Sequence, residues 1–272
     1  MTRLLSYLDI EKKIKDCHDR KGKAVAFFPV GCTEQHGPHL PIQTDTLIAE
    51  NVSRSVSDAL GDPHWGYVFP SISYTPTKSN INYPGTVSVD EDLLRQYVKQ
   101  LCHCVLKSDF DAIILVSGHG PADPSLNEIS FNIVHEQYAQ KDPTVKPVFV
   151  LSLRECRFIV ENRLGQKSGQ HADWRELLYL VYILGNAYFD HKKVHDITEF
   201  QRTNSFPIQE YPVFGVPMEM RSVQGVLGDP TPASEENWND LAKISWEETI
   251  RQLTHTARCK LDRFWNKDAS SC

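Results

Sequence analysis

The segment PVGCTEQHGPHLPIQTDT, residues 29–46, is the most informative stretch of this 272-residue chain. An apolar run over residues 24–30 leads directly into it, and a short run of this kind that ends at a glycine predicts a buried strand. The turn that follows is rich in glycine and proline. It carries three side chains of the kind that bind divalent zinc, manganese or iron: Glu34, His36 and Asp45.

The spacing of these three residues admits two interpretations. Glu34 and His36 are two residues apart, so both side chains point to the same side of an extended segment. Asp45 precedes a helical pattern over residues 46–60, where its carboxylate would also favour the helix N-terminus. The alternative to a metal site is that Asp45 caps the helix and that Glu34 and His36 are solvated loop residues. This alternative must be considered because an isolated E-x-H pattern is short and common. The rest of the chain favours the metal site.

Composition narrows the class of protein. The chain has 29 lysines and arginines against 35 aspartates and glutamates, a net charge of −6, and no basic stripe, so we expect no nucleic-acid partner. Its seven cysteines are scattered and odd in number, which does not predict a disulfide framework. The N-terminus does not resemble a signal peptide and no apolar run reaches membrane-spanning length. We therefore expect a cytoplasmic protein with no membrane partner.

Strand and helix patterns alternate along the chain. This alternation predicts an α/β fold, with a mostly parallel sheet flanked by helices on both faces, in a single domain over residues 1–272. Such sheets bind ligands at the carboxyl ends of their strands. Residues 188–232 show little periodicity. The expected strands are 24–30, 66–73, 112–116 and 146–153, and the expected helices are 8–17, 46–60, 90–106, 125–138, 174–184 and 237–258.

A histidine follows another expected strand. His119 lies in Ser117-Gly118-His119-Gly120, directly after the apolar residues 112–116. Loops that leave parallel strands meet at one edge of the sheet, so His119 is expected to lie near Glu34, His36 and Asp45. A surface histidine in a glycine turn is the alternative.

A third polar segment, QHADWRE at residues 170–176, begins the apolar helix 174–184. It offers His171 and Glu176 as further candidates for the same site. Alternatively, His171 caps this helix and Glu176 complements the helix dipole, a small effect of about 0.3–1 kcal/mol.

Together these segments resemble the creatininase, or creatinine amidohydrolase, family. Residues 29–46 resemble its PxGsxEQHGpHLPlxTD block, the most specific of the matches. Four weaker matches follow in family order: residues 81–86 to FPGT, 117–120 to NGHGGN, 171–176 to HAGxxE and 225–230 to GVxGDP. The resemblance implies a dinuclear metal hydrolase that cleaves C–N bonds, often of cyclic amides or formamides. It also implies a homo-oligomer, commonly a hexamer.

The resemblance assigns metal ligands position by position. Glu34 and His119 would hold one of two divalent ions (Zn, Mn or Fe(II)), His36 would hold the other, and Asp45 would bridge them. Glu176 would complete the second site. Creatininase itself uses a glutamate two residues after the glycine-flanked histidine, where this chain has Pro121.

Positions expected to face the substrate depart from the family pattern. Ala122 replaces the final asparagine of NGHGGN, and Asn80 and Ile81 stand where many members have acidic and histidine residues. These departures predict a small-molecule substrate other than creatinine.

His171 is the candidate proton donor to the leaving nitrogen, because the ordinary pKa of histidine lies near neutrality. Asp123 is a weaker candidate for the same proton relay. We expect the substrate to contact Lys78, Asn80, Arg154 and Trp174.

Arg154 stands near the position of an aromatic residue in creatininase, and Lys78 and Arg175 adjoin two motif blocks. These cations predict an amide or cyclic-amide substrate with an acidic group. Pairing of Arg154 with Glu155 or Asp173 in solvent is the alternative.

Two other functions fit the sequence less well. Cys32 would be the nucleophile of a thiol hydrolase, with His36 or His39 as its base. A protein that keeps the family fold but only binds a small molecule or a partner is the third interpretation, suggested by the departures at residues 80–81 and 121–122.

Overall fold

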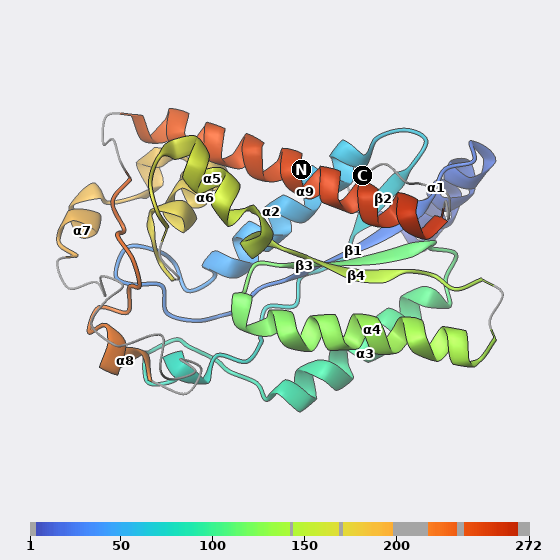
Figure 1. Cartoon of the computed structure of the whole chain (residues 1–272), viewed down its shortest axis with the longest axis horizontal. Helices are drawn as coiled ribbons and strands as arrows, with labels where there is room; N and C mark the ends of the chain where they lie inside the picture. Colours follow the sequence, from blue (N-terminus) through green and yellow to red (C-terminus); the bar gives the residue numbers. More distant parts are fainter. Residues whose placement is uncertain (1–3, 142–143, 169–170, 198–216, 233–236, 266–272) are drawn as a thin grey trace.

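The computed structural model describes residues 4–141, 144–168, 171–197, 217–232 and 237–265. Within these ranges, four parallel strands form one sheet in the order β2-β1-β3-β4. Helices cover both of its faces (Figure 1). This arrangement confirms the predicted α/β fold with a parallel sheet. The strands are β1 (Ala24–Val30), β2 (Trp65–Val68), β3 (Ala112–Ser117) and β4 (Val148–Ser152).

The central strands are buried on both faces because their sequences are apolar without interruption. Every residue of β1 and β3 is buried, and neighbouring residues of β1 enter different cores. Phe27 packs into the core on one face, and Phe28 packs into the core on the other. The continuous apolar pattern therefore predicts the two-sided burial of a parallel sheet.

The strand expected over residues 66–73 is shorter in the structure. Phe69 still donates its backbone N–H to Phe27, and Ile72 donates to Pro29, both at 2.9 Å. Pro70 lies between them and has no N–H to donate, which interrupts the ladder after β2.

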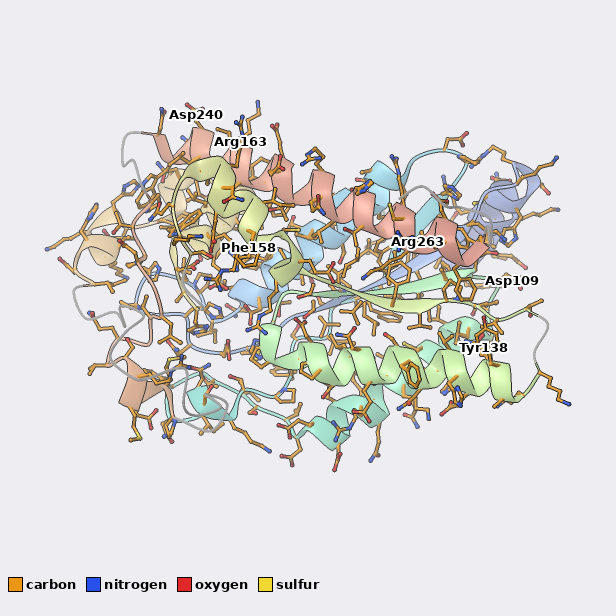
Figure 2. All side chains as sticks on the ribbon, viewed as in Figure 1. Asp109, Tyr138, Phe158, Arg163, Asp240 and Arg263 are labelled. Carbon is orange, nitrogen blue, oxygen red and sulfur yellow. The ribbon has the colours of Figure 1, made fainter. Side chains whose placement is uncertain are left out.

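The helices form two layers. One core contains residues of α2 (Thr44–Leu60), α5 (Arg157–Leu164), α6 (Trp174–Leu184) and α9 (Trp238–Trp265). The other contains residues of α1 (Tyr7–Asp19), α3 (Glu91–Leu106) and α4 (Asp123–Ala139). Outer helix faces carry exposed side chains such as Tyr138, Arg163 and Asp240 (Figure 2).

Two short helices, α7 (His191–His195) and α8 (Met218–Arg221), lie at the carboxyl end of the strands (Figure 1). They come from the segment 188–232, in which residues 198–216 lie outside the described ranges. Short 3-10 helices follow several loops: η1 (Lys78–Asn80), η2 (Gly120–Ala122), η3 (Leu153–Cys156) and η4 (Asn186–Tyr188). No helix in the described parts combines the length and the apolar character needed to cross a membrane.

The strand register brings three loops to one edge. Val30 pairs with Ser117, and Ser117 pairs with Ser152, so β1, β3 and β4 end side by side. Gly118 lets the loop after β3 approach α2 closely, because a Cβ at this position would lie 2.5 Å from the carbonyl oxygen of Asp45. The loop after β3 therefore lies directly against the start of α2.

Candidate functional site

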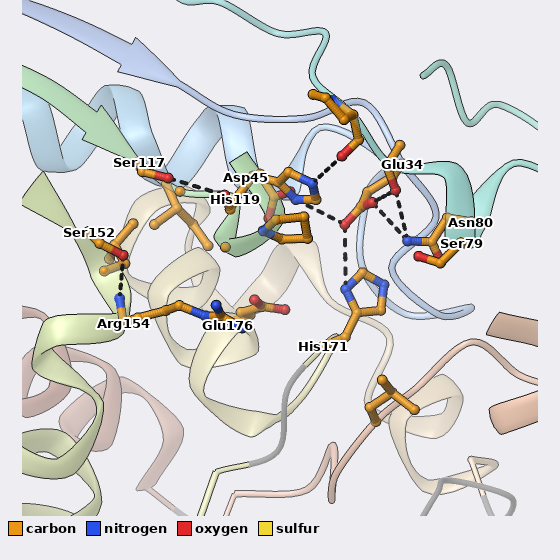
Figure 3. Close-up of a pocket in the computed structure, with 18 of the residues that line it drawn as sticks. Glu34, Asp45, Ser79, Asn80, Ser117, His119, Ser152, Arg154, His171 and Glu176 are labelled. Carbon is orange, nitrogen blue, oxygen red and sulfur yellow. Dashed lines mark hydrogen bonds and ion pairs between the residues drawn. The ribbon is translucent and has the colours of Figure 1, made fainter. Parts of the chain in front are cut away.

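A cavity of about 550 Å³ opens at the carboxyl edge of the sheet. Loops after β1, β3 and β4 and the start of α6 contribute to its wall (Figure 3). Five of the expected metal-binding or catalytic residues line it: Glu34, Asp45, His119, His171 and Glu176. His36 is fully buried against this group.

Asp45 occupies the centre of the group. It is the second residue of α2, and its two carboxylate oxygens face different imidazoles. Oδ1 lies 3.2 Å from Nε2 of His36, and Oδ2 lies 2.9 Å from Nδ1 of His119. A carboxylate placed in this way can bind two cations at once, one through each oxygen.

Glu34 and His119 form one half of the site. Glu34 Oε1 lies 3.4 Å from His119 Nδ1, and its other oxygen accepts hydrogen bonds from the Thr77 hydroxyl and, at 2.8 Å, from Asn80 Nδ2. His119 Nε2 lies 3.0 Å from the carbonyl oxygen of Pro76. A carbonyl only accepts, so Nε2 carries the proton and the lone pair of Nδ1 faces the two carboxylates.

His36 and Glu176 form the other half with Asp45. His36 Nδ1 lies 3.2 Å from the carbonyl oxygen of Glu34, which fixes the proton on Nδ1. Nε2 is buried without a hydrogen-bond partner, 3.2 Å from Asp45 Oδ1 and 3.7 Å from Glu176 Oε2. A buried imidazole nitrogen that faces two carboxylates requires a cation, a proton or a metal ion, between them, and this fits a metal ligand.

The donor atoms lie at suitable distances for divalent cations. Two ligands that each lie about 2.1 Å from one ion are at most about 4.2 Å apart, and the contacts within both halves are shorter than this. Two further groups have donor atoms within 4.8 Å of one another. One consists of Glu34, His36 and His171, and the other of Cys32, Glu34 and His119. Mixed imidazole and carboxylate ligands suit zinc, manganese or iron(II).

The electrostatics of the cluster favour bound positive charge. Burial alone would raise the pKa of Glu34, but the neighbouring His119 outweighs it and lowers the pKa. Burial alone would lower the pKa of His36, yet Asp45 raises it to about 10. Burial raises the pKa of Glu176 to about 7. The carboxylates thus stabilise cations within the site, as expected for a metal centre.

His171 contacts this cluster. Its ring centroid lies 4.3 Å from that of His36, and Nδ1 lies 3.5 Å from Glu34 Oε1. Nε2 lies 2.8 Å from the backbone carbonyl oxygen of Gln35, which accepts, and 3.0 Å from the side-chain amide nitrogen of Gln35, which donates, so either tautomer of His171 finds a partner there. Burial, followed by the charge of His36, lowers the pKa of His171 to about 4, so the imidazole is neutral at neutral pH. It is therefore available as a ligand or a base.

Two predicted residues lie away from the cavity. Asp123 accepts a hydrogen bond from the Ser152 hydroxyl at 2.7 Å and links the end of β4 to the start of α4. Trp174 is fully buried in the core, and its indole N–H donates to the carbonyl oxygen of Lys167 at 2.9 Å. Neither residue lines the cavity, so the structure does not support a proton-relay role for Asp123 or a substrate contact for Trp174.

Lys78 and Asn80 line the cavity but already have partners. The Lys78 ammonium forms ion pairs with Asp90 at 3.2 Å and Glu91 at 3.1 Å. Asn80 is buried, donates to Glu34 and accepts from Gln35 Nε2 at 2.8 Å. Asn80 therefore lines the cavity while its amide holds the candidate ligand Glu34 in position.

The environment of Cys32 does not suit a nucleophile. The side chain is fully buried outside the cavity wall, and burial raises the pKa of its thiol to about 12. Its Sγ lies 3.8 Å from the carbonyl oxygen of Thr75, which cannot act as a base. A thiol nucleophile needs a base within hydrogen-bond reach, so the geometry disfavours the thiol-hydrolase interpretation.

Several residues in or beside the cavity wall were not predicted. Gln35 lies inside the E-Q-H motif, and this position is a sequence signal that could have identified it. In the structure, its side-chain Nε2 lies 3.0 Å from His171 Nε2. Met218 and Arg221 line the cavity from α8, in a segment whose sequence shows no periodicity. Only the folded chain brings these two residues to the site.

Known proteins match much of the chain. The family model described as creatinine amidohydrolase matches residues 11–253. The mycofactocin precursor peptide peptidase of Mycolicibacterium smegmatis is 38% identical over 98 residues, which cover 35% of this chain and 39% of that protein. The matched segment thus spans about two fifths of this relative's length.

Two further similarities extend over more of the chain. The 2-amino-5-formylamino-6-ribosylaminopyrimidin-4(3H)-one 5'-monophosphate deformylase of Methanothermus fervidus is 26% identical over 183 residues, covering 67% of this chain and 60% of that protein. The solved structure "Creatininase Mn" superposes with a TM-score of 0.77 at 21% identity, covering 95% of this chain and 97% of that chain. At this identity, the superposition establishes the shared fold.

Proposed function

Because the chain belongs to the creatininase, or creatinine amidohydrolase, family, we propose that it is a metal-dependent amidohydrolase that cleaves a C–N bond of a small molecule. The observation that carries this proposal is the position of Asp45, whose two oxygens face two imidazoles on opposite halves of one buried cluster. The matching family model covers the segments that supply every member of this cluster.

We propose two divalent ions, zinc, manganese or iron(II), as the cofactors. Glu34 and His119 would hold one, His36 and Glu176 the other, with Asp45 shared between them. Bound there, the ions would supply Lewis-acid polarisation of the amide carbonyl and of water. Pro121 occupies the place of a creatininase ligand, and we propose that Glu176, 3.7 Å from His36 Nε2, takes over that role.

The protein contributes a rigid set of donors. Thr77 and Asn80 hold one oxygen of Glu34, and the carbonyls of Pro76 and Glu34 orient His119 and His36. Fixed ligands of this kind require no rearrangement during the reaction. His171 lies against Glu34 and remains our candidate to transfer a proton to the leaving nitrogen.

The named relatives indicate the reacting bond. A peptidase, a deformylase acting on a formylamino group and a creatinine amidohydrolase all cleave an amide C–N bond. The cavity of about 550 Å³ is of a size typical of small-molecule sites. We therefore expect a formamide or cyclic amide as the substrate of this chain.

Metal analysis tests the proposal. Purified wild-type protein should hold about two equivalents of metal and lose hydrolysis of its substrate in EDTA, with formamides, lactams and cyclic ureides as the screen. Asp45→Asn should lower both equivalents, because one carboxylate serves both ions. Glu50→Gln, a carboxylate of the same helix outside the cluster, is the matched control.

A wild-type protein without bound metal would refute the proposed function. An Asp45→Asn variant that keeps both equivalents and full activity would show that Asp45 is only a helix-terminal residue. The cytoplasmic location and the homo-oligomer, a hexamer by family resemblance, remain predictions. Light scattering of the purified protein would test the hexamer.

A further inference from the structure

We propose that the substrate carries an anionic group, a carboxylate or a phosphate, and that Arg154 and Arg175 bind this group in the cavity. The inference rests on the proposed hydrolysis at the adjoining cluster and specifies its substrate class. Both arginines line the cavity beside the candidate metal ligands.

Arg175 is a buried cation, and two of its guanidinium nitrogens have no hydrogen-bond partner among the described residues. Only 8% of the residue is exposed, and its Nε and Nη1 atoms are buried and unpaired. The nearby Asp173 accepts from the backbone N–H of Arg175, at 3.0 Å. A guanidinium stays protonated in proteins, so its burial is costly unless an anion pairs with it. The cavity is the place from which such an anion can reach it.

Arg154 reaches the same cavity from η3, at the end of β4. Its side chain extends toward Glu176 (Figure 3). In the described ranges no ion pair forms with its guanidinium, and Glu155 pairs instead with Lys260 at 3.6 Å. The expected alternative, pairing of Arg154 with Glu155 or Asp173, is therefore wrong.

Gly120 leaves space for this arginine. A Cβ at position 120 would lie 2.6 Å from Nε and 2.8 Å from Cζ of Arg154. Any larger residue would displace the guanidinium from the loop after β3. The glycine thus permits the position in which Arg154 lines the cavity.

Charge balance leaves positive charge beside the cluster, although Asp173 and Glu176 both attract the Arg175 guanidinium. The three carboxylates of Glu34, Asp45 and Glu176 would be neutralised by two divalent ions, which together carry four positive charges. The guanidinium groups therefore remain as surplus positive charge next to the reacting bond. Arginine binds carboxylate and phosphate through parallel hydrogen bonds, which makes these two groups the expected ligands.

The test measures binding of three matched formamides to the purified, metal-containing protein by isothermal titration calorimetry. N-formyl-β-alanine carries a carboxylate, N-formylphosphoethanolamine carries a phosphate, and N-formylethanolamine is neutral. We expect one charged probe to bind about tenfold or more tightly than the neutral probe, as hydrogen bonds to charged groups permit. The stronger of the two charged probes identifies the anion.

The variants assign that preference to residues. Arg154→Gln and Arg175→Gln should each reduce the preference to about threefold or less, whereas Arg163→Gln, an exposed arginine on α5 (Figure 2), should keep it. Arg154 is exposed, so its variant should fold normally and can decide the test if Arg175→Gln does not fold. Equal binding of charged and neutral probes, no binding of any probe, or an anion preference that survives Arg154→Gln would overturn the proposal.

These outcomes are separate from failure of the proposed function. A protein that holds no metal and hydrolyses nothing, but binds the anionic probe through these arginines, would keep the anion site and refute the hydrolase. A metal-containing enzyme that hydrolyses neutral amides without a charge preference would keep the proposed hydrolase and refute the anion site.

Discussion

Replacing Arg175 by methionine should stabilise the substrate-free protein. Methionine keeps the long aliphatic side chain that packs at the start of α6 but removes a buried charge and its unpaired N–H groups. An arginine kept for structure would show the opposite effect. The sign of the change therefore separates a ligand-binding role from a structural one.

The magnitude follows from the contacts. Two buried donors without partners, Nε and Nη1, each cost about 1–3 kcal/mol. Against this, the variant loses the attraction of the guanidinium to Asp173 and Glu176, about 1–2 kcal/mol in all at short range. The difference is a net gain of about 0–5 kcal/mol, an interval that brackets the roughly 1–4 kcal/mol found when buried ionic groups are replaced by apolar ones. For a chain of this size, that gain corresponds to a rise in Tm of up to roughly 10 °C.

Thermal unfolding followed by circular dichroism in a buffer free of phosphate and carboxylate measures this effect. Adding the preferred anionic formamide should then raise the Tm of the wild type but not that of Arg175→Met, because only the wild type binds it tightly. Arg163→Met, at an exposed position, should change stability by about 0.5 kcal/mol or less. A Tm for Arg175→Met several degrees below that of the wild type would refute the reasoning.

Three further substitutions test other parts of the structure. Glu176→Gln should release one metal equivalent and leave the other, measured on dialysed protein; retention of both would place Glu176 outside the metal site. Cys32→Ser should keep kcat/KM within about threefold, and complete inactivation at normal metal content would restore the thiol mechanism. Burial alone would raise the pKa of Glu161, but hydrogen bonds from Arg157 and Ser168 lower it to about 2. The ionised form thus stabilises the fold by about 2–3 kcal/mol above pH 4.5 and loses this effect as the pH falls toward 2. Urea unfolding of Glu161→Gln should therefore show a deficit at pH 7 that shrinks at pH 3, and an equal deficit at both pH values would contradict this account.

The convergence of the candidate metal ligands could be predicted because each of these residues follows a recognisable pattern. Glu34, His36 and His119 come directly after fully apolar strands, and parallel strands that end side by side bring their loops together. Asp45 begins a helix that starts in the same loop. Their convergence therefore follows from topology, although the distances that make Asp45 a candidate bridge come only from the structure.

The residues that contact the cavity were harder to predict, because proximity in sequence does not fix where a side chain points. Trp174 and Arg175 are neighbours on α6, yet Trp174 enters the core and Arg175 reaches the cavity. Asn80 lies at the cavity, but its amide is used to hold Glu34 and Gln35. Asp123 follows His119 by four residues and still points toward Ser152. Each outcome depends on a tertiary contact that local sequence does not encode.

The departures from the family pattern in the loop after β3 form a consistent set. Pro121 stands where the family resemblance places a glutamate ligand of creatininase, and Glu176, 3.7 Å from His36 Nε2, is the carboxylate that we propose takes its place. The adjoining Gly120 leaves room for Arg154 in the cavity wall. A substitution at Gly120 should then act on Arg154 rather than on the metals. Gly120→Ala should weaken binding of the anionic formamide at unchanged metal content, whereas loss of metal from this variant would show that the loop supports His119 instead.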